Sequence, residues 1–261
     1  MPTQTVATWN VNSIRTRQEQ VLDWLRAHEP AVLCLQETKT PDDRFPAEAF
    51  EAAGYRVAAS GQRTYNGVAI LSREPLGDVA AGFPGDPDPA QARVLSGTWR
   101  DLRIVDVYVP NGSEVGSPSY EYKLAWLQAL RAWLERDHDP AEPLLMLGDF
   151  NIAPEERDVW DPERWKEKVL CSEPEREALR RLQRWGLRDL FRRHHDEGGL
   201  YSWWDYRRGR FRRDQGLRID LLLGTDAVAR RAAASSIDRE PRKREQPSDH
   251  APVRVELEMP G

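Results

Sequence analysis

Leu144-Leu145-Met146-Leu147-Gly148-Asp149 is an apolar run that ends in a carboxylate, and Val32-Leu33-Cys34-Leu35-Gln36-Glu37 repeats the pattern upstream. Runs of this length predict buried strands. Ile219-Asp220 and Asp249-His250 place further acids beside apolar runs. A polar group that follows a buried strand lies at the edge of a sheet, where ligands commonly bind. One such acid would be an ordinary turn residue, but several together predict a site shared by Glu37, Asp149, Asp220 and Asp249.

Similar runs recur along the chain with turn residues between them. The predicted strands cover residues 6–10, 31–36, 67–72, 103–109, 144–147, 219–223 and 253–257. Apolar residues three and four apart predict helices over residues 15–28, 120–135 and 175–185. Because strands and helices interleave, the fold class is α/β or α+β. No proline-rich or serine-rich linker divides the chain, so we expect a single domain over residues 1–261, with 82–89 and 239–247 as surface loops.

The composition of the 261-residue chain limits the class of protein. Hydrophobic residues make up 39% and charged residues 31%, which supplies a core and excludes a disordered chain. No apolar run approaches the roughly 18 residues of a membrane helix, and the first residues have no basic or apolar signal region, so we expect a cytoplasmic protein without a membrane partner. Cys34 and Cys171 show no metal-ligand spacing and are expected to be reduced, structural thiols.

The net charge of −5 is not typical of a protein that coats nucleic acid. The basic residues are nevertheless unevenly placed. One short aromatic-rich stretch contains Arg207, Arg208, Arg210, Arg212, Arg213 and Arg218. This stretch predicts a local surface for a polyanion, and the alternative is that an arginine-rich chain only reflects a GC-rich genome.

The clustered acids indicate a cation. Four carboxylates in one half-buried pocket repel one another and raise one another's pKa. Oxygen ligands without accompanying cysteines favour Mg²⁺, or Mn²⁺ in its place, over structural zinc. His250 adjoins one of the acids, and Asn10 and Asn151 add two amides. Such a set suits phosphoryl chemistry, and the absence of a Walker-type glycine-rich loop from the sequence disfavours nucleotide-driven work.

Eight short motifs lie along the chain in order. They are Trp9-Asn10-Val11-Asn12, Leu35-Gln36-Glu37-Thr38-Lys39, Asn66-Gly67-Val68-Ala69-Ile70, Tyr108-Val109-Pro110-Asn111-Gly112, Gly148-Asp149-Phe150-Asn151-Ile152, Trp203-Trp204-Asp205-Tyr206-Arg207, Leu217-Arg218-Ile219-Asp220 and Ser248-Asp249-His250-Ala251-Pro252. In order and spacing this series resembles the motifs of bacterial exonuclease III and AP endonucleases, within the endonuclease/exonuclease/phosphatase superfamily. The match runs nearly end to end.

The resemblance implies a four-layer α/β sandwich, with two packed mixed sheets flanked by helices and the site at one edge of the sheets. It also implies a Mg²⁺-dependent phosphodiesterase that acts on DNA. By motif position, the metal ligands would be Asn10, Glu37 and Asp249. Whether one ion or two bind stays open, and the ligands of a second ion would be Asp149, Asn151 and His250.

The same resemblance implies roles in the reaction. Asp149 would activate the water or protonate the leaving oxygen, two alternatives that the sequence leaves open. Asn151 would hold the phosphate. His250, oriented by Asp220, would contact a non-bridging oxygen, and Tyr108 would assist the phosphate or the leaving group.

Substrate contacts are implied at Tyr65, Arg93, Asn111 and Lys123. An apolar set near the metal would accept a sugar that lacks its base, and it consists of Trp203, Leu217 and Ile219. The chain departs from its relatives at Gln246, where Lys is frequent, and at Asp214, where Asn is frequent. Both departures make the local field less positive and are expected to weaken DNA binding.

The implied function is a monomeric repair enzyme that cleaves double-stranded DNA 5′ to abasic sites and acts on 3′ ends as an exonuclease and phosphatase. One alternative keeps the fold but acts on RNA, a lipid headgroup or another phosphodiester, although the chain lacks an apolar membrane-inserting hairpin. Another alternative is a non-catalytic DNA-binding module. Every implied catalytic position holds a competent residue, and metal-dependent turnover separates these hypotheses.

Overall fold

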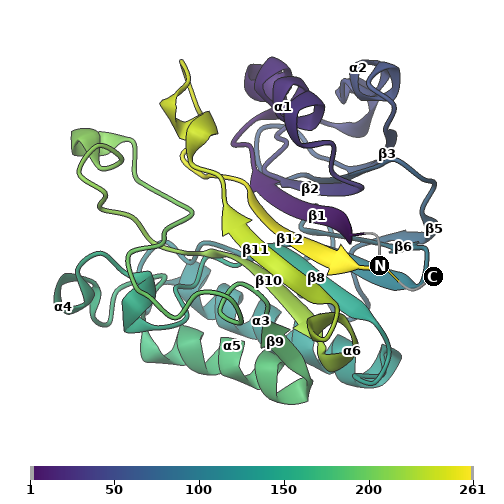
Figure 1. Ribbon diagram of the computed structural model, residues 1–261. Coiled ribbons are helices and arrows are strands. Elements are labelled where there is room, and N and C mark those ends of the chain that lie inside the picture. The colour runs from purple at the N-terminus through teal and green to yellow at the C-terminus, as the bar shows by residue number, and fades with distance from the viewer. Residues whose placement is uncertain (1–2, 260–261) are drawn as a thin grey trace.

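The computed structural model describes residues 3–259, whose strands form two mixed six-stranded sheets (Figure 1). In spatial order, the first sheet contains β11 (Ala232–Ile237), β12 (Val253–Glu258), β1 (Thr3–Asn10), β2 (Val32–Gln36), β4 (Val68–Ser72) and β3 (Arg56–Ser60). The second contains β5 (Gly77–Ala81), β6 (Val94–Trp99), β7 (Leu102–Tyr108), β8 (Leu144–Asp149), β10 (Asp220–Thr225) and β9 (Leu187–Asp189).

Helices cover the outer faces of both sheets (Figure 1). The first sheet carries α1 (Ile14–His28) and α2 (Ala47–Ala52), and the second carries α3 (Pro118–Asp137) and α5 (Glu173–Trp185). The shorter elements are α4 (Pro162–Trp165), α6 (Asp226–Ala229), and the 3₁₀ segments η1 (Asp42–Arg44), η2 (Glu156–Asp158), η3 (Arg207–Gly209) and η4 (Glu240–Lys243). The layers therefore run helix, sheet, sheet, helix, and the predicted four-layer α/β sandwich is confirmed.

The apolar runs are continuous because their strands are buried on both faces. In β2, Val32 and Cys34 point into the core between the sheets, while Leu33 and Leu35 pack under α1. In β8, Leu145 and Leu147 fill the same inter-sheet core, while Leu144 and Met146 face α3. Strands covered on both faces read as unbroken hydrophobic segments rather than as alternating ones.

The seven predicted strands and three predicted helices are all present, within one or two residues at most ends. Sequence reasoning missed β3, β5, β6, β9 and β11, together with the short helices. The residues of β5 are all exposed, and β11 reads Ala-Ala-Ala-Ser-Ser-Ile, so neither strand has the apolar contrast on which the prediction depends. Of the helices in the described part of the chain, none is long and apolar enough to span a bilayer.

Strand pairing brings separate motifs to one edge. The neighbours β1 and β2 are parallel, as are β7 and β8, so each pair ends at the same side. Tyr108 lies opposite Asp149 in the β7–β8 register, and Asp220 lies opposite Asp149 in the antiparallel β8–β10 register. Gly148 permits this close pairing, since a Cβ there would lie 2.0 Å from the Val107 carbonyl oxygen and its φ is +144°.

Candidate active site

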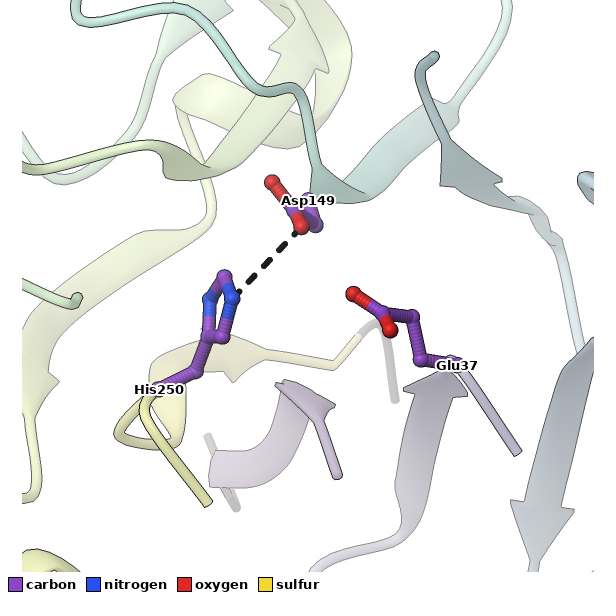
Figure 2. A group of neighbouring side chains, drawn as sticks. All are labelled: Glu37, Asp149 and His250. Atoms are coloured by element: carbon purple, nitrogen blue, oxygen red, sulfur yellow. Dashed lines mark ion pairs between the residues drawn. The ribbon is translucent and has the colours of Figure 1, made fainter. Parts of the chain in front are cut away.

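Three ionisable side chains converge where the two sheets meet. Glu37 follows β2, Asp149 ends β8 and His250 precedes β12. One ligand atom from each lies within 4.8 Å of the others, and the three side chains point toward one another (Figure 2). His250 Nε2 lies 3.7 Å from Asp149 Oδ2. This geometry can hold a metal ion, with two carboxylates and an imidazole as ligands. Glu37, Asp149 and His250 are called the metal group below.

Asn10 joins the two sheets at this point. Its fully buried amide donates from Nδ2 to Glu37 Oε1 and to Asp149 Oδ2, both at 2.8 Å. Glu37 follows β2 of the first sheet, whereas Asp149 ends β8 of the second sheet. Asn10 therefore fixes the spacing of the two carboxylates, and its role as a metal ligand stays a prediction.

Asp149 and His250 shift each other's pKa. Burial is the largest cause that raises the pKa of Asp149 to about 7; the positive charge of His250 opposes the rise, and the charges of Asp220 and Glu37 add to it. Burial by itself would lower the pKa of His250, but Asp220 and Asp149 outweigh it and raise that pKa to about 10. His250 Nδ1 lies 2.9 Å from Asp220 Oδ2, so the Asp220 carboxylate accepts a hydrogen bond from Nδ1–H and orients the ring.

Tyr108 and Asn151 lie beside Asp149. Burial, followed by the charges of Glu37 and Asp149, raises the pKa of Tyr108, so its phenol keeps its proton at neutral pH. Asn151 donates from its backbone N–H to Asp149 Oδ1 at 2.9 Å and from Nδ2 to the Val109 carbonyl at 3.0 Å. Its Nδ2 also reaches Asp149 Oδ2 at 3.3 Å, the weakest of these contacts and the one that a bound phosphate could replace.

Asp249 is held by two neighbouring side chains. It lies outside the group formed by Glu37, Asp149 and His250. Trp203 donates to its Oδ2 at 3.0 Å and Asn12 donates to its Oδ1 at 2.9 Å. Burial tends to raise its pKa, but the charge of His250 and these two donors lower it. Each carboxylate oxygen thus accepts one hydrogen bond from the protein, and Asp249 as a metal ligand stays a prediction.

Two residues of the site were missed from the sequence. Lys39 Nζ lies 2.8 Å from Glu37 Oε2 and donates to Asn12 Oδ1, so its charge offsets part of the acidic cluster. Asn12 in turn donates to Asp249. Asn12, Glu37 and Lys39 all have positive φ, between 44° and 53°, an uncommon conformation that collects at functional sites. The signal was present, because both missed residues belong to the quoted motifs.

A cavity of about 670 Å³ lies beside the metal group. Its lining includes three of the four predicted substrate contacts, Tyr65, Arg93 and Asn111, together with Tyr108. Tyr65 is 69% exposed, and the Arg93 guanidinium carbon lies 4.9 Å from the centre of the Tyr108 ring. The fourth prediction, Lys123, is wrong as a direct contact, because its side chain is completely buried and paired with Glu175.

The predicted apolar pocket is also largely closed. Leu217 is 0% exposed and Ile219 is 1% exposed, and both belong to a small core cluster under the site. Trp203 is partly exposed and packs against that cluster. Leu217 and Ile219 are therefore core residues in this structure, and only Trp203 of the three can meet a substrate without a rearrangement.

The arginine stretch divides into exposed and buried members. Arg207, Arg208, Arg212 and Arg213 are exposed on the loop around η3, the green segment at the upper left of Figure 1. Arg210 lies over the Trp160 ring at 5.0 Å. Arg218 is completely buried between Asp158 and Asp189, so it cannot contact DNA and is not part of the predicted surface.

The two positions that depart from the family pattern are both exposed. Asp214 pairs with Arg239 at 2.8 Å and accepts a hydrogen bond from Trp204 Nε1 at 3.2 Å. The backbone carbonyl of Gln246 accepts from Arg17 Nε at 3.1 Å. Neither residue touches Glu37, Asp149 or His250, so any effect of these departures is confined to binding.

Comparison with known proteins places this geometry in a family. Residues 7–250 match the endonuclease/exonuclease/phosphatase family model. Exodeoxyribonuclease III of Haemophilus influenzae is 34% identical over 262 residues, which cover 96% of this chain and 98% of that protein. A 3′-5′ exonuclease from Neisseria meningitidis, NExo, is 43% identical with a TM-score of 0.94, covering 98% of this chain and all of that one.

A second structure of the Neisseria enzyme describes it as a 3′ phosphatase bound to a product DNA hairpin. An AP endonuclease from Archaeoglobus fulgidus is 36% identical with a TM-score of 0.95, covering 98% of this chain and all of that one. These similarities confirm the relationship that the eight motifs indicated. The chain belongs to the endonuclease/exonuclease/phosphatase family.

Proposed function

We propose that this protein is a metal-dependent nuclease of base-excision repair that cleaves duplex DNA 5′ to abasic sites and acts on 3′ ends as a 3′–5′ exonuclease and phosphatase. At the coarser level the chain is a DNA repair nuclease, a hydrolase of DNA phosphodiester bonds. The observation that carries the proposal is the convergence of Glu37, Asp149 and His250 beside the groove of about 670 Å³ that Tyr65, Arg93 and Asn111 line. We further propose that it acts as a monomer in the cytoplasm.

The donor set fits a divalent cation. Glu37, Asp149 and His250 offer ligand atoms within 4.8 Å, and Asn10 adds an amide beside both carboxylates. Burial is the first cause of the raised pKa of Asp149, and the charges of Asp220 and Glu37 add to it, so a cation among these carboxylates would relieve their repulsion. Mg²⁺ or Mn²⁺ bound there would polarise the phosphate and neutralise charge on its oxygens.

The protein's own groups would then handle protons and orientation. His250 Nε2 could serve as a metal ligand or as a donor, but not as both. In this proposal the ring, oriented by Asp220, stays protonated and donates from Nε2 to a non-bridging phosphate oxygen, so the ion would rest on the carboxylates and Asn10. Asp149 would accept a proton from the attacking water or return one to the leaving oxygen. Tyr108 donates its phenolic proton toward the phosphate or the leaving group.

The groove and the exposed arginines would bind the DNA. Tyr65 offers an exposed aromatic face, while Arg93 and Asn111 offer donors along the same cavity. Arg207, Arg208, Arg212 and Arg213 supply positive charge on the neighbouring loop. A phosphate backbone is the polyanion that such a combination suits.

Selectivity for abasic DNA rests on Trp203 in this proposal. An extruded sugar is cheapest to accommodate where no base is stacked, and an aromatic wall then recognises its apolar face. Because Leu217 and Ile219 are buried, the sugar would meet a smaller apolar surface than the sequence predicted. We expect the preference for abasic over undamaged internal sites to depend mainly on extrusion and on Trp203.

One experiment tests these activities together. The purified protein is incubated with a duplex carrying one internal abasic analogue, an undamaged blunt duplex, a duplex ending in a 3′-phosphate, and an RNA duplex. Each substrate is tested with Mg²⁺ and with excess chelator. The Asp149→Asn variant, purified in the same way, controls for contaminating nucleases.

We expect Mg²⁺-dependent incision at the abasic analogue, slower shortening of the blunt duplex, and release of the 3′-phosphate. Turnover in chelator would contradict the metal site. Equal cleavage of abasic and undamaged internal positions would remove the repair specificity and leave a general nuclease. Cleavage of RNA alone would replace the DNA substrate, and binding without turnover would indicate a DNA-binding module.

A further inference from the structure

Lys123 on α3 and Glu175 on α5 form a buried ion pair behind the candidate active site. Both side chains are completely buried. Lys123 Nζ donates to Glu175 Oε1, to the Asn111 carbonyl at 3.1 Å and to the Asn151 carbonyl at 2.6 Å. A lysine ammonium has three N–H donors, so each one has a protein acceptor. No donor is left over for DNA.

Glu175 is held as firmly as its partner. It is the third residue of α5, whose N-cap is Ser172. Its Oε2 accepts from the Ser172 backbone N–H at 3.1 Å and from the Ser172 hydroxyl at 2.6 Å, and its Oε1 accepts from the Leu170 N–H at 3.0 Å. The carboxylate therefore anchors the ammonium to the start of α5, while the lysine stem belongs to α3.

The two carbonyls that Lys123 binds belong to the paired asparagines of the site. Asn111 Nδ2 donates to Asn151 Oδ1 at 3.0 Å. Asn151 has a φ of +50°, in the left-handed region that few residues other than glycine, asparagine and aspartate adopt. Gly112, next to Asn111, has a φ of +92°, and a Cβ there would lie 3.1 Å from Lys123 Cδ. The lysine thus packs directly under both loops.

We propose that the Lys123–Glu175 pair positions Asn111 and Asn151 for the scissile phosphate by fixing their backbone carbonyls. Lys123 is a positioning residue and not a DNA contact. One N–H of the Asn111 amide is used on Asn151, and the exposed amide lies on the groove with its second N–H free of hydrogen bonds within residues 3–259. The Lys123–Glu175 pair keeps that second N–H directed at the scissile phosphate. The inference rests on the proposed function, because it assigns the phosphate to this groove.

The first test is Lys123→Met, which keeps the apolar stem and removes the three donors. We expect the single-turnover cleavage rate to fall at least about tenfold, as for a misplaced reacting group. The salt dependence of DNA binding should keep its slope, because every phosphate remains bound by the same side chains. A slope reduced by about one unit would identify Lys123 as a direct phosphate ligand and overturn the proposal.

Leu130→Ala is the matched control. Leu130 is a fully buried residue of the same helix that packs against the second sheet. It should lower the melting temperature while the cleavage rate, measured well below melting, stays near that of the wild type. If Leu130→Ala and Lys123→Met lose rate in proportion to lost stability, Lys123 is merely structural and the proposal fails.

Coupling to Asn111 gives a second readout. In the wild-type background, Asn111→Ala should slow single-turnover cleavage by removing the aimed donor. In the Lys123→Met background the same substitution should cost a clearly smaller factor, because the amide is already misplaced. Equal factors in the two backgrounds would show that the residues act independently and would contradict the proposal.

A readout without catalysis separates this inference from the proposed function. In protein labelled with ¹⁵N-asparagine, the Asn151 side-chain amide should exchange its protons faster in Lys123→Met than in the wild type. If Lys123→Met does not fold, Glu175→Gln serves instead, since it removes the anchoring charge but keeps the shape. Unchanged exchange overturns the positioning role, whereas failure of the wild type to cleave any DNA, with altered exchange, overturns only the proposed function.

Discussion

Two buried aspartates in this protein have opposite electrostatics. Asp158 and Asp149 are each at most 1% exposed. At Asp158, burial favours a higher pKa, but the guanidinium groups of Arg218 and Arg192 outweigh it and lower the pKa. At Asp149, burial prevails with the help of Asp220 and Glu37, and the pKa is raised. The same residue type at the same depth thus reports two different surroundings.

The difference lies in the charge balance of each region. The Asp158 network sets two carboxylates, of Asp158 and Asp189, against two guanidinium groups, of Arg192 and Arg218. Among residues 3–259, the active-site region has four carboxylates and two cations that lie within ion-pair distance of them. These are Glu37, Asp149, Asp220 and Asp249 against Lys39 and protonated His250. The balanced network is structural, and the excess of carboxylates at the active site suits a divalent cation.

The largest expected effect is on stability, in the charge-balanced network around Asp158. Arg218→Met leaves Asp158 and Asp189 buried without their shared partner, which should lower the free energy of unfolding by about 3–5 kcal/mol. Chemical denaturation measures it. Arg207→Met, at an exposed position of the same stretch, is the control and should change little. An Arg218→Met protein of normal stability that binds DNA weakly would reverse the interpretation and return Arg218 to the DNA surface.

The next largest effect is on the cleavage rate, at the active site with its excess of carboxylates. Asp149→Asn should lower the single-turnover rate by at least about a hundredfold, the scale of a proton-transferring group, with little change in DNA affinity. Because it relieves repulsion with Glu37 and Asp220, it should not destabilise the metal-free protein. Rapid-quench kinetics measures the cleavage rate, and thermal melting in chelator measures the stability of the metal-free protein. A marked loss of stability would mean that Asp149 resembles Asp158 after all.

Metal binding should respond less steeply than the chemistry. Glu37→Gln removes one anionic ligand, so the Mg²⁺ concentration for half-maximal activity should rise at least about tenfold. Asp249→Asn is the informative companion, because Asp249 lies outside the metal group and should shift the Mg²⁺ titration less. Equal shifts for the two variants would restore Asp249 as a ligand.

The smallest effect concerns the exposed arginines. Replacing Arg207 and Arg208 together by Gln should weaken duplex binding and reduce its salt dependence by about one unit of slope for each phosphate that is no longer bound. Binding titrations across a range of salt concentrations measure that slope. Arg244→Gln, an exposed arginine that pairs with Asp23 outside this loop, is the control. An unchanged slope would leave the arginine-rich stretch explained by composition alone.

The sequence was most informative where burial is two-sided. β2 and β8 are apolar along their whole length, so the strands and the acids that follow them were predictable. β5 and β11 lie at sheet edges and carry small or exposed residues, so periodicity could not reveal them. Pattern alone identifies an element only when many of its residues face the core.

Within the site, residue type did not reveal depth. Arg207 and Arg218 belong to one stretch, yet one is exposed and the other fully buried against two acids. Lys123 matched a substrate position but is enclosed by α5, whose Glu175 lies far away in sequence. Such facts depend on contacts between distant segments, which a single sequence does not encode in any local pattern.

The first strand of the chain pairs with the last. β1 lies between β2 and β12 in its sheet, and His250 directly precedes the segment that leads into β12. During synthesis, Glu37 and Asp149 therefore leave the ribosome long before the imidazole that completes their group. A nascent copy that stops short of His250, or one clipped ahead of that residue, carries the two carboxylates without the imidazole. The topology makes the assembled group a property of a chain that has been synthesised through β12.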